Sequence, residues 1–248
     1  MKNSESLSWD SAELKTLLEC EAQRLVGVGL SSVQIDNFMV YGRLLAAGNK
    51  RLNLSAITEP KEVIRKHFVD SLAALPYLPK KLPSLADVGS GAGLPGLALK
   101  IARPQIKLTL IESINKKAAF LKETVDRLAL SEVVVCSRRA EEVGQDKLFR
   151  EQFLVVTARA VAALPVLLEL CLPLVVVGGR FVAYKGPGVT DELGAARQAL
   201  DKLGGEVTEV KEFSLPGGEQ RSLVVVTKVS PTPAKYPRPP GRPAKRPL

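Results

Sequence analysis

The 248-residue sequence contains little of the chemistry that holds metals or forms disulfides, with one histidine and three cysteines. Cys20, Cys136 and Cys171 lie far apart, and no CxxC pair occurs. This pattern excludes a disulfide framework and the usual structural zinc sites. His67 is the only histidine, so a histidine-rich metal centre is not expected either. We therefore expect a reduced, cytoplasmic protein without a metal.

A hydrophobic leader and a membrane span are also missing from the sequence. Residues 1–15 are polar and acidic and contain no apolar signal-peptide core. Residues 160–177 carry only Glu169 as a charge, but Pro165 and Pro173 interrupt them. The segment is also short for a span, which needs about 20 apolar residues. We expect a buried helix that runs into a central strand, and no membrane partner.

Acidic residues are absent from the C-terminal segment, although the whole chain has a net charge of +9. Residues 231–248 contain five basic residues and seven prolines. Such a composition predicts an extended or mobile tail when the protein is alone. The tail is either an inert solvated segment or an arm that binds nucleic-acid phosphates through Arg238 and Arg242. If it is an arm, deletion of residues 231–248 should weaken RNA binding more than cofactor binding.

Glycine is concentrated in one stretch, residues 87–96, with the sequence DVGSGAGLPG. It follows an apolar run at 85–88 and precedes a helical pattern at 97–102. Glycines allow a sharp turn and a close approach of the backbone to a ligand, and a following helix directs free N–H groups toward that ligand. No GK[ST] follows, so a P-loop is excluded. The glycines also fit the GxGxxG pattern of dinucleotide-binding proteins, so the class of nucleotide stays open.

Strand and helix patterns alternate after the glycine stretch. Strands are predicted at 85–88, 106–111, 132–136, 153–157, 179–184, 206–212 and 223–228, and helices at 97–102, 115–128, 161–170 and 190–203. This alternation predicts an α/β fold, with a mostly parallel seven-stranded sheet that ends in an antiparallel hairpin. It is typical of Rossmann-like class I S-adenosylmethionine-dependent methyltransferases. We expect an N-terminal helical layer over 1–78, a methyltransferase domain over 79–230 and a basic tail over 231–248.

Eight motifs together resemble one family, the bacterial guanine-N7 methyltransferases of small-subunit (16S) ribosomal RNA (RsmG, also called GidB). They are NLSAI at 53–57, RKHFVDSL at 65–72, DVGSGAGLPG at 87–96, ESINKK at 112–117, RAEE at 139–142, TARA at 157–160, GRFVAYKG at 179–186 and YPRPPG at 236–241. They are spread along most of the chain. Two positions depart from the family pattern: Leu154 stands where an aspartate is frequent, and Ala158 replaces a serine.

The resemblance implies S-adenosyl-L-methionine as the cofactor, and small-subunit ribosomal RNA or a ribosomal particle as the partner of a monomeric enzyme. The implied cofactor-binding residues are Gly89, Gly91, Gly93, Leu94, Glu112, Ser113, Ile114, Ala140, Glu141 and Arg159. His67 and Asp70 are candidate residues of the active cleft, and Lys185 and Arg221, with Arg238 and Arg242, are candidate RNA contacts. Each of these residues also has an ordinary structural interpretation, such as a helix cap, an internal ion pair or a solvated charge.

Guanine N7 carries a lone pair and no proton, so its methylation needs no acid or base from the protein. The enzyme's contribution is then in-line positioning, which can be worth about 7–11 kcal/mol. Two alternatives stay open. A nicotinamide-dependent oxidoreductase would use the same loop, but the only Tyr-x-x-x-Lys spacing, at Tyr77 and Lys81, lies upstream of it. A non-catalytic RNA-binding protein on this fold is compatible with the basic tail.

Overall fold

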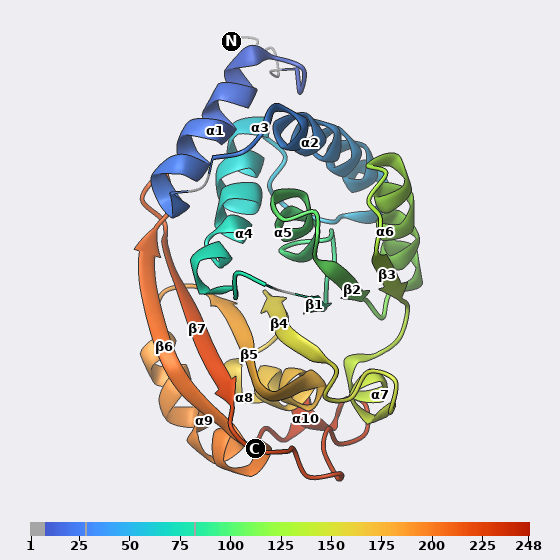
Figure 1. Cartoon of the computed structure of the whole chain (residues 1–248), viewed down its shortest axis with the longest axis vertical. Helices are drawn as coiled ribbons and strands as arrows, with labels where there is room; N and C mark the ends of the chain where they lie inside the picture. Colours follow the sequence, from blue (N-terminus) through green and yellow to red (C-terminus); the bar gives the residue numbers. More distant parts are fainter. Residues whose placement is uncertain (1–7, 28, 82) are drawn as a thin grey trace.

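In a computed structural model, the chain folds into three layers, with a seven-stranded sheet between two sets of helices (Figure 1). The structure describes residues 8–27, 29–81 and 83–248. The helices are α1 (Ala12–Val26), α2 (Ser32–Leu52), α3 (Pro60–Val63), α4 (Asp70–Leu72), α5 (Gly96–Ala102), α6 (Asn115–Arg127), α7 (Ala140–Gln145), α8 (Leu164–Cys171), α9 (Val189–Leu203) and α10 (Arg242–Lys245). Within the described part of the chain, no helix is both long and apolar enough to cross a membrane.

The sheet has the strand order β3-β2-β1-β4-β5-β7-β6. The strands are β1 (Ser84–Val88), β2 (Lys107–Ile111), β3 (Val133–Cys136), β4 (Phe153–Arg159), β5 (Val175–Lys185), β6 (Gly205–Ser214) and β7 (Gln220–Lys228). β1 to β5 pair in parallel, whereas β7 is antiparallel to both β5 and β6. The strand order reverses between β1 and β4: from β1 the chain first adds strands on one side of the sheet, and from β4 it adds them on the other. In such sheets a ligand binds at this point, beyond the carboxyl ends of the strands.

The N-terminal helices begin where the sequence offers capping groups. The Ser11 hydroxyl accepts a hydrogen bond from the Leu14 amide at 3.3 Å, and Gly27 ends α1 in the left-handed conformation. Ser31 and Gln34 form a reciprocal capping box at the start of α2. Pro60 occupies the first turn of α3, where its missing N–H is not needed. A π-helical segment, Ile64–Val69, joins α3 to α4 and carries His67.

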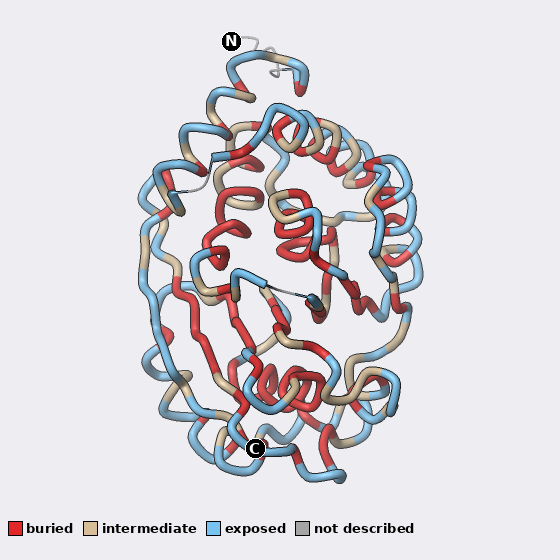
Figure 2. Tube along the Cα trace, viewed as in Figure 1, coloured by how far each residue is buried: buried red, intermediate tan, exposed pale blue. Residues whose placement is uncertain are grey.

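Two apolar clusters lie on opposite faces of the sheet. One combines α1, α2 and the helices up to α6 with side chains such as Leu85 and Val155. The other combines α7, α8 and α9 with side chains such as Val156 and Phe181. In Figure 2 the buried parts of the chain run through the central strands and α8, while β6 at the sheet edge is mostly exposed. The segment 160–177 forms α8 and the start of β5, as the sequence predicts.

The C-terminal segment departs from its sequence-based prediction. It is not an extended tail: it packs on α7 and α8, buries Tyr236 and ends with the short helix α10. The Arg238 side chain donates to Glu169, whose side chain is fully buried. Composition predicted disorder because proline-rich basic segments bury little apolar surface. The ion pair and the buried tyrosine supply order that composition does not reveal.

Candidate cofactor and RNA cleft

The glycine stretch forms the turn between β1 and α5 at the carboxyl edge of the sheet. Gly89, Gly91 and Gly93 have φ values of 68°, 56° and 98°, a region that other residues rarely adopt. A Cβ atom at Gly89 would lie 2.5 Å from the Cγ2 atom of Val161. Glycine at this position is therefore required both by the turn and by close packing.

Asp87 anchors the turn from inside the sheet. Its Oδ1 accepts a hydrogen bond from the Thr157 hydroxyl at 2.8 Å, and its Oδ2 accepts one from the Gly96 amide at 3.2 Å. Burial raises the pKa of Asp87 to about 6, while the hydrogen bond from Thr157 opposes that rise. Both carboxylate oxygens thus hold the start of α5 against β4.

Glu112 lies just beyond the end of β2, where the resemblance implies a ribose-binding acid. Its Oε2 accepts the Gly91 amide at 2.9 Å, and its Oε1 accepts the Ile114 amide at 2.8 Å. The residue is only 5% exposed. A carboxylate oxygen can accept more than one hydrogen bond. The carboxylate therefore fixes the loop and keeps acceptor capacity for two hydroxyl groups of a ligand.

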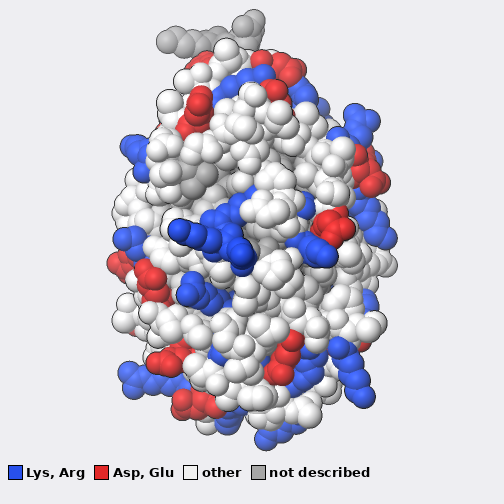
Figure 3. Space-filling model, viewed as in Figure 1, with Lys and Arg blue, Asp and Glu red and all other residues white. Residues whose placement is uncertain are grey.

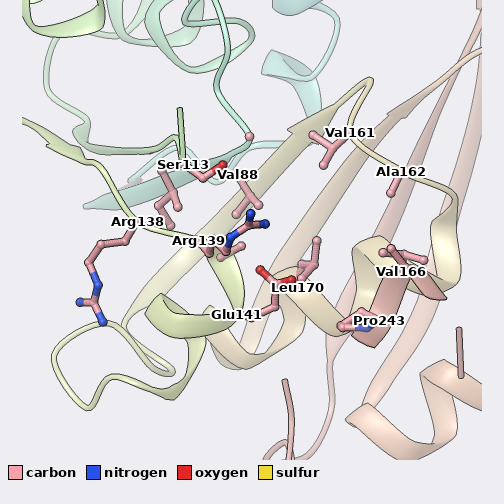
Figure 4. A pocket seen from close by; sticks show the side chains of 14 residues that line it. Val88, Ser113, Arg138, Arg139, Glu141, Val161, Ala162, Val166, Leu170 and Pro243 are labelled. Carbon is pink, nitrogen blue, oxygen red and sulfur yellow. The ribbon is translucent and has the colours of Figure 1, made fainter. Parts of the chain in front are cut away.

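A first cavity, which we call the apolar cavity, has a volume of about 220 Å³ and lies between β1, β2, α7 and α8. Val88, Ile111, Val166 and Leu170 supply apolar wall, and the backbone of Gly89 forms one edge. In Figure 4, Arg139 and Glu141 point toward the cavity, whereas Arg138 extends away from it. A slot of this kind suits a flat aromatic ring with one polar edge.

A second cavity, the charged cleft, has a volume of about 760 Å³ and adjoins the first. Gly89, Ser113 and Val161 line both cavities, so the two cavities meet at these three residues. The charged residues that line the cleft are Lys66, Asp70, Glu112, Lys117, Arg159, Lys185, Glu192 and Arg221. Basic side chains outnumber acidic ones, which favours a polyanionic ligand.

Asp70 and Arg159 form the central ion pair of the charged cleft. The Nη1 atom of Arg159 lies 2.7 Å from Oδ2 of Asp70, and the Asp70 side chain is 5% exposed. Burial raises the pKa of Asp70, and the guanidinium of Arg159 acts against that rise. Oδ1 of Asp70 has no hydrogen-bond partner among the described residues, and Nε of Arg221 stands 3.8 Å from it. The carboxylate thus orients two arginines at the cleft wall.

His67 also lines the charged cleft, and both of its ring nitrogens are engaged. Nδ1 lies 3.1 Å from the carbonyl oxygen of Lys66, and Nε2 lies 2.7 Å from the Ser55 hydroxyl. A carbonyl can only accept, so Nδ1 carries the proton and Nε2 accepts from Ser55. Burial, with the nearby charge of Arg159, lowers the pKa of His67 to about 4. The imidazole is therefore neutral at physiological pH.

Most of the remaining predicted residues line one of the two cavities, but Arg238 and Arg242 line neither. Leu94 and Ile114 line the charged cleft, and Ala140 and Glu141 line the apolar cavity. Lys185 in the cleft pairs with Glu192 at 2.7 Å. Arg238 lines neither cavity, because its guanidinium is held by Glu169, and its role as an RNA contact stays a prediction. Arg242 is exposed at the start of α10.

Several residues of the site carry no obvious sequence signal. Ser55 and Ile57 line the charged cleft, and Pro243 and Ala244 line the apolar cavity. The motif NLSAI contains Ser55 and Ile57, and the motif YPRPPG ends two residues before Pro243. Neither motif predicts a role for these side chains. Their positions depend on contacts between segments far apart in the chain.

The two cavities fit the parts of S-adenosylmethionine. The apolar cavity suits an adenine ring, the charged cleft has room for the methionine end, and the role of Glu112 as acceptor for the ribose hydroxyls stays a prediction. The acceptor capacity left on the Glu112 carboxylate is compatible with that prediction, because a ribose offers two adjacent donors.

A family model described as "GidB: rRNA small subunit methyltransferase G" matches residues 34–224 of the chain. A ribosomal RNA small subunit methyltransferase G from Roseiflexus sp. (strain RS-1) is 49% identical over 225 residues, which cover 91% of this chain and 96% of that protein. The protein of the same name from Acetivibrio thermocellus is 44% identical over 241 residues and covers 96% of this chain and 99% of its own length.

Solved structures show the same fold at low sequence identity. A 16S rRNA (adenine(1408)-N(1))-methyltransferase from Catenulisporales acidiphilia superposes with a TM-score of 0.51 at 13% identity, covering 60% of this chain and 86% of that chain. A structure described as a predicted O-methyltransferase from Agrobacterium tumefaciens gives a TM-score of 0.52 at 22% identity, covering 67% of this chain and 81% of that chain. At these identities the likeness concerns the fold, which is that of class I S-adenosylmethionine-dependent methyltransferases.

Proposed function

Because the chain belongs to the rRNA small subunit methyltransferase G family, we propose that it methylates N7 of a guanine in small-subunit ribosomal RNA, with S-adenosylmethionine as the methyl donor. The observation that carries the proposal is the border that the two cavities share at Gly89, Ser113 and Val161. A cofactor whose adenine lies in the apolar cavity would present its reactive end inside the charged cleft. The charged cleft is also where a nucleotide of the RNA would enter, so the two reactants would meet there.

The geometry of the cleft agrees with a reaction that needs no base. When bound, S-adenosylmethionine supplies an electrophilic methyl group. His67 holds its only ring proton toward the Lys66 carbonyl, and its Nε2 lone pair is taken by Ser55. Asp70 is neutralised by Arg159. These side chains therefore shape and orient the cleft, and the N7 lone pair of guanine provides the nucleophile.

Basic side chains around the cleft support RNA as the substrate. Lys66, Lys117 and Arg221 line it, and Arg242 is exposed on the neighbouring C-terminal segment. Figure 3 shows that Lys and Arg also gather near the middle of the face drawn there. Phosphate contacts supply most of the affinity for RNA and make it depend on salt concentration. We include a monomeric state in this proposal, because one chain supplies both cavities. We also include a cytoplasmic location, because the proposed substrate is ribosomal RNA.

Family membership leaves the two alternatives without support. A nicotinamide-dependent oxidoreductase would need a proton donor at the cofactor, and Tyr77 and Lys81 lie before β1, not among the residues that line either cavity. A purely RNA-binding protein would have no need for the glycine turn and the Glu112 contacts, which are intact.

The test is transfer of labelled methyl groups to small-subunit RNA and to particles that lack this modification, followed by nuclease digestion and mass spectrometry. We expect 7-methylguanosine with the wild-type chain and a loss of at least about tenfold with Glu112→Gln, because the ribose contact is weakened. Glu206→Gln, an exposed glutamate on β6, is the matched control and should keep full activity. A different methylated nucleoside, or cofactor binding without transfer, would disprove the proposal.

A further inference from the structure

The C-terminal strap, which we define as residues 236–245, encloses part of the apolar cavity. We propose that this strap is part of the cofactor site, with Pro243 and Ala244 forming the outer wall against which the adenine ring lies. Glu141 then acts as a positioning residue that holds the strap. This inference rests on the proposed function, because it assigns the apolar cavity to adenine.

The strap is fixed to the second layer of helices by a buried ion pair. The backbone amide and Nε of Arg238 donate to Oε1 of Glu169, both at 2.8 Å, and Nη2 donates to Oε2 at 2.6 Å. Glu169 has no exposed surface. A buried carboxylate with three donors from one residue holds that residue firmly, because loss of a donor would leave charge unpaired. The ion pair therefore sets the path of the strap toward the cavity.

The same region is tied to α7, the helix that forms another wall of the cavity. Nε2 of Gln145 donates to the Pro237 carbonyl at 2.8 Å, and a Cβ atom at Gly144 would lie 2.8 Å from Cγ of Pro237. Helix and strap are thus in close contact with no space for an added methyl group. A shift of the strap would move the cavity wall that α7 supplies.

Glu141 makes the contact nearest to the cavity. Its Oε1 accepts a hydrogen bond from the Gly241 amide at 2.9 Å, and Gly241 begins the turn into α10 with a φ of 80°. Glu141 itself lines the cavity, as do Pro243 and Ala244 two and three residues after that turn. Figure 4 shows Pro243 across the cavity from Val88 and Ser113.

This arrangement gives Glu141 a different role from the one the resemblance implies, in which it follows the third strand and contacts the adenine edge. One carboxylate oxygen is used by Gly241, so its first effect is to place the strap. The wall opposite β1 and β2 would be open without Pro243 and Ala244. Adenine binding and ordering of the strap should therefore stabilise each other.

The experiment measures binding of S-adenosylhomocysteine by calorimetry, in the absence of RNA. We expect the double variant Pro243→Gly/Ala244→Gly to bind it about tenfold more weakly, a change equivalent to about 1.4 kcal/mol. Pro247→Gly, an exposed proline beyond the strap, is the matched control and should bind like the wild type. RNA affinity of the double variant should stay within about twofold of wild type, since no charge is removed.

A second pair of variants tests how Glu141 acts. Glu141→Ala should weaken S-adenosylhomocysteine binding, while Glu142→Ala, its exposed neighbour on α7, should not. If Glu141 acts through the strap, its effect should vanish in the Pro243→Gly/Ala244→Gly background, since contacting groups give non-additive changes. Hydrogen exchange at residues 241–245 should also slow when S-adenosylhomocysteine is added.

The results separate this inference from the proposed function. Unchanged cofactor affinity in Pro243→Gly/Ala244→Gly, or additive effects with Glu141→Ala, would overturn the role of the strap. A wild-type protein that binds S-adenosylhomocysteine but methylates no RNA would sink the proposed function and leave the strap standing. Wild-type protein that fails to bind S-adenosylhomocysteine would overturn both.

Discussion

The two cavities differ in how their walls are held in place. The charged cleft is lined in part by paired groups, such as Asp70 with Arg159 and Lys185 with Glu192, in which one charge places the other. In the apolar cavity the inner walls are packed side chains, such as Val88, Ile111 and Leu170, and the ion pair of Arg238 with Glu169 lies outside the cavity and holds the strap. Ionic placement is directional but sensitive to the loss of one partner, whereas packing tolerates small changes of shape.

From this difference we infer that the two cavities have different roles in the proposed reaction. The apolar cavity would recognise the part of the cofactor that does not react. The charged cleft would receive RNA and hold the reacting groups in line. Substitutions at the shared border should therefore weaken the binding of both cofactor and RNA. Substitutions in one cavity should weaken only the function of that cavity. The following predictions run from the largest expected effect to the smallest.

Gly89→Ala should break both cavities at once. The new Cβ atom would meet Val161, which lines both, and the residue would also be strained at a φ of 68°. We expect cofactor affinity to fall at least about 100-fold, from roughly 3 kcal/mol of strain and displacement. Gly178→Ala is the control, because Gly178 has a φ of 84° but nothing within 4 Å of an added Cβ. Equal losses in the two variants, measured by calorimetry, would contradict the role of the Val161 contact.

Arg159→Met should damage the charged cleft alone. It leaves Asp70 buried without its main partner, and we expect the free energy of unfolding to fall by about 3–5 kcal/mol. Arg159→Met/Asp70→Asn should recover part of that stability, because the unpaired charge is gone, yet not methyl transfer. Arg138→Met breaks the ion pair with Asp146, in which the Arg138 side chain is 41% exposed. It should lower the free energy of unfolding by only about 0–1 kcal/mol. Denaturant unfolding checks all three, and similar losses for Arg138→Met and Arg159→Met would be the contrary result.

His67→Asn should change how stability depends on pH. The pKa of His67 is lowered from 6.5 to about 4 in the folded protein, so the unfolded chain binds its proton first as the pH falls. The contribution of His67 to stability is therefore complete above pH 6.5 and is lost as the pH falls toward 4. We expect the wild type to lose about 2 kcal/mol more than His67→Asn across that window. The raised pKa of Asp87 makes stability change with pH in the opposite direction, but Asp87 is present in both proteins and its effect cancels in the difference. Parallel curves of unfolding free energy against pH for the two proteins would refute the lowered pKa of His67.

Local patterns in the sequence were sufficient to predict the sheet and the glycine turn after β1. All seven predicted strands are present, and the antiparallel position of β7 between β5 and β6 agrees with the predicted hairpin. Hydrophobic periodicity and glycine spacing act over a few residues, which is why they could be predicted from one sequence. The position of Glu112 at the end of β2 follows from the same local pattern.

Long-range contacts account for what could not be predicted. The order of the strap depends on Arg238 meeting Glu169, 69 residues earlier in the chain. The neutral state of His67 depends on its burial and on the nearby positive charges of Arg159 and Arg221, which lower its pKa. Within the helical layer predicted over residues 1–78, a π-helical segment carries His67. Such segments are frequent at functional sites, yet nothing in residue spacing distinguishes them from ordinary helix.

Two tyrosine hydroxyls make the N-terminal helices inseparable from the catalytic sheet. Tyr41 on α2 donates to the Ala92 carbonyl in the glycine turn at 2.8 Å, and Tyr184 on β5 donates to the Ser71 carbonyl at 2.6 Å. Both side chains are buried, so neither bond can be exchanged for water without a cost. The helical layer is therefore no transferable module. A chimaera that grafts it onto another methyltransferase sheet would have to keep both hydroxyls within reach of the two backbone carbonyls, or lose the contact that holds the glycine turn.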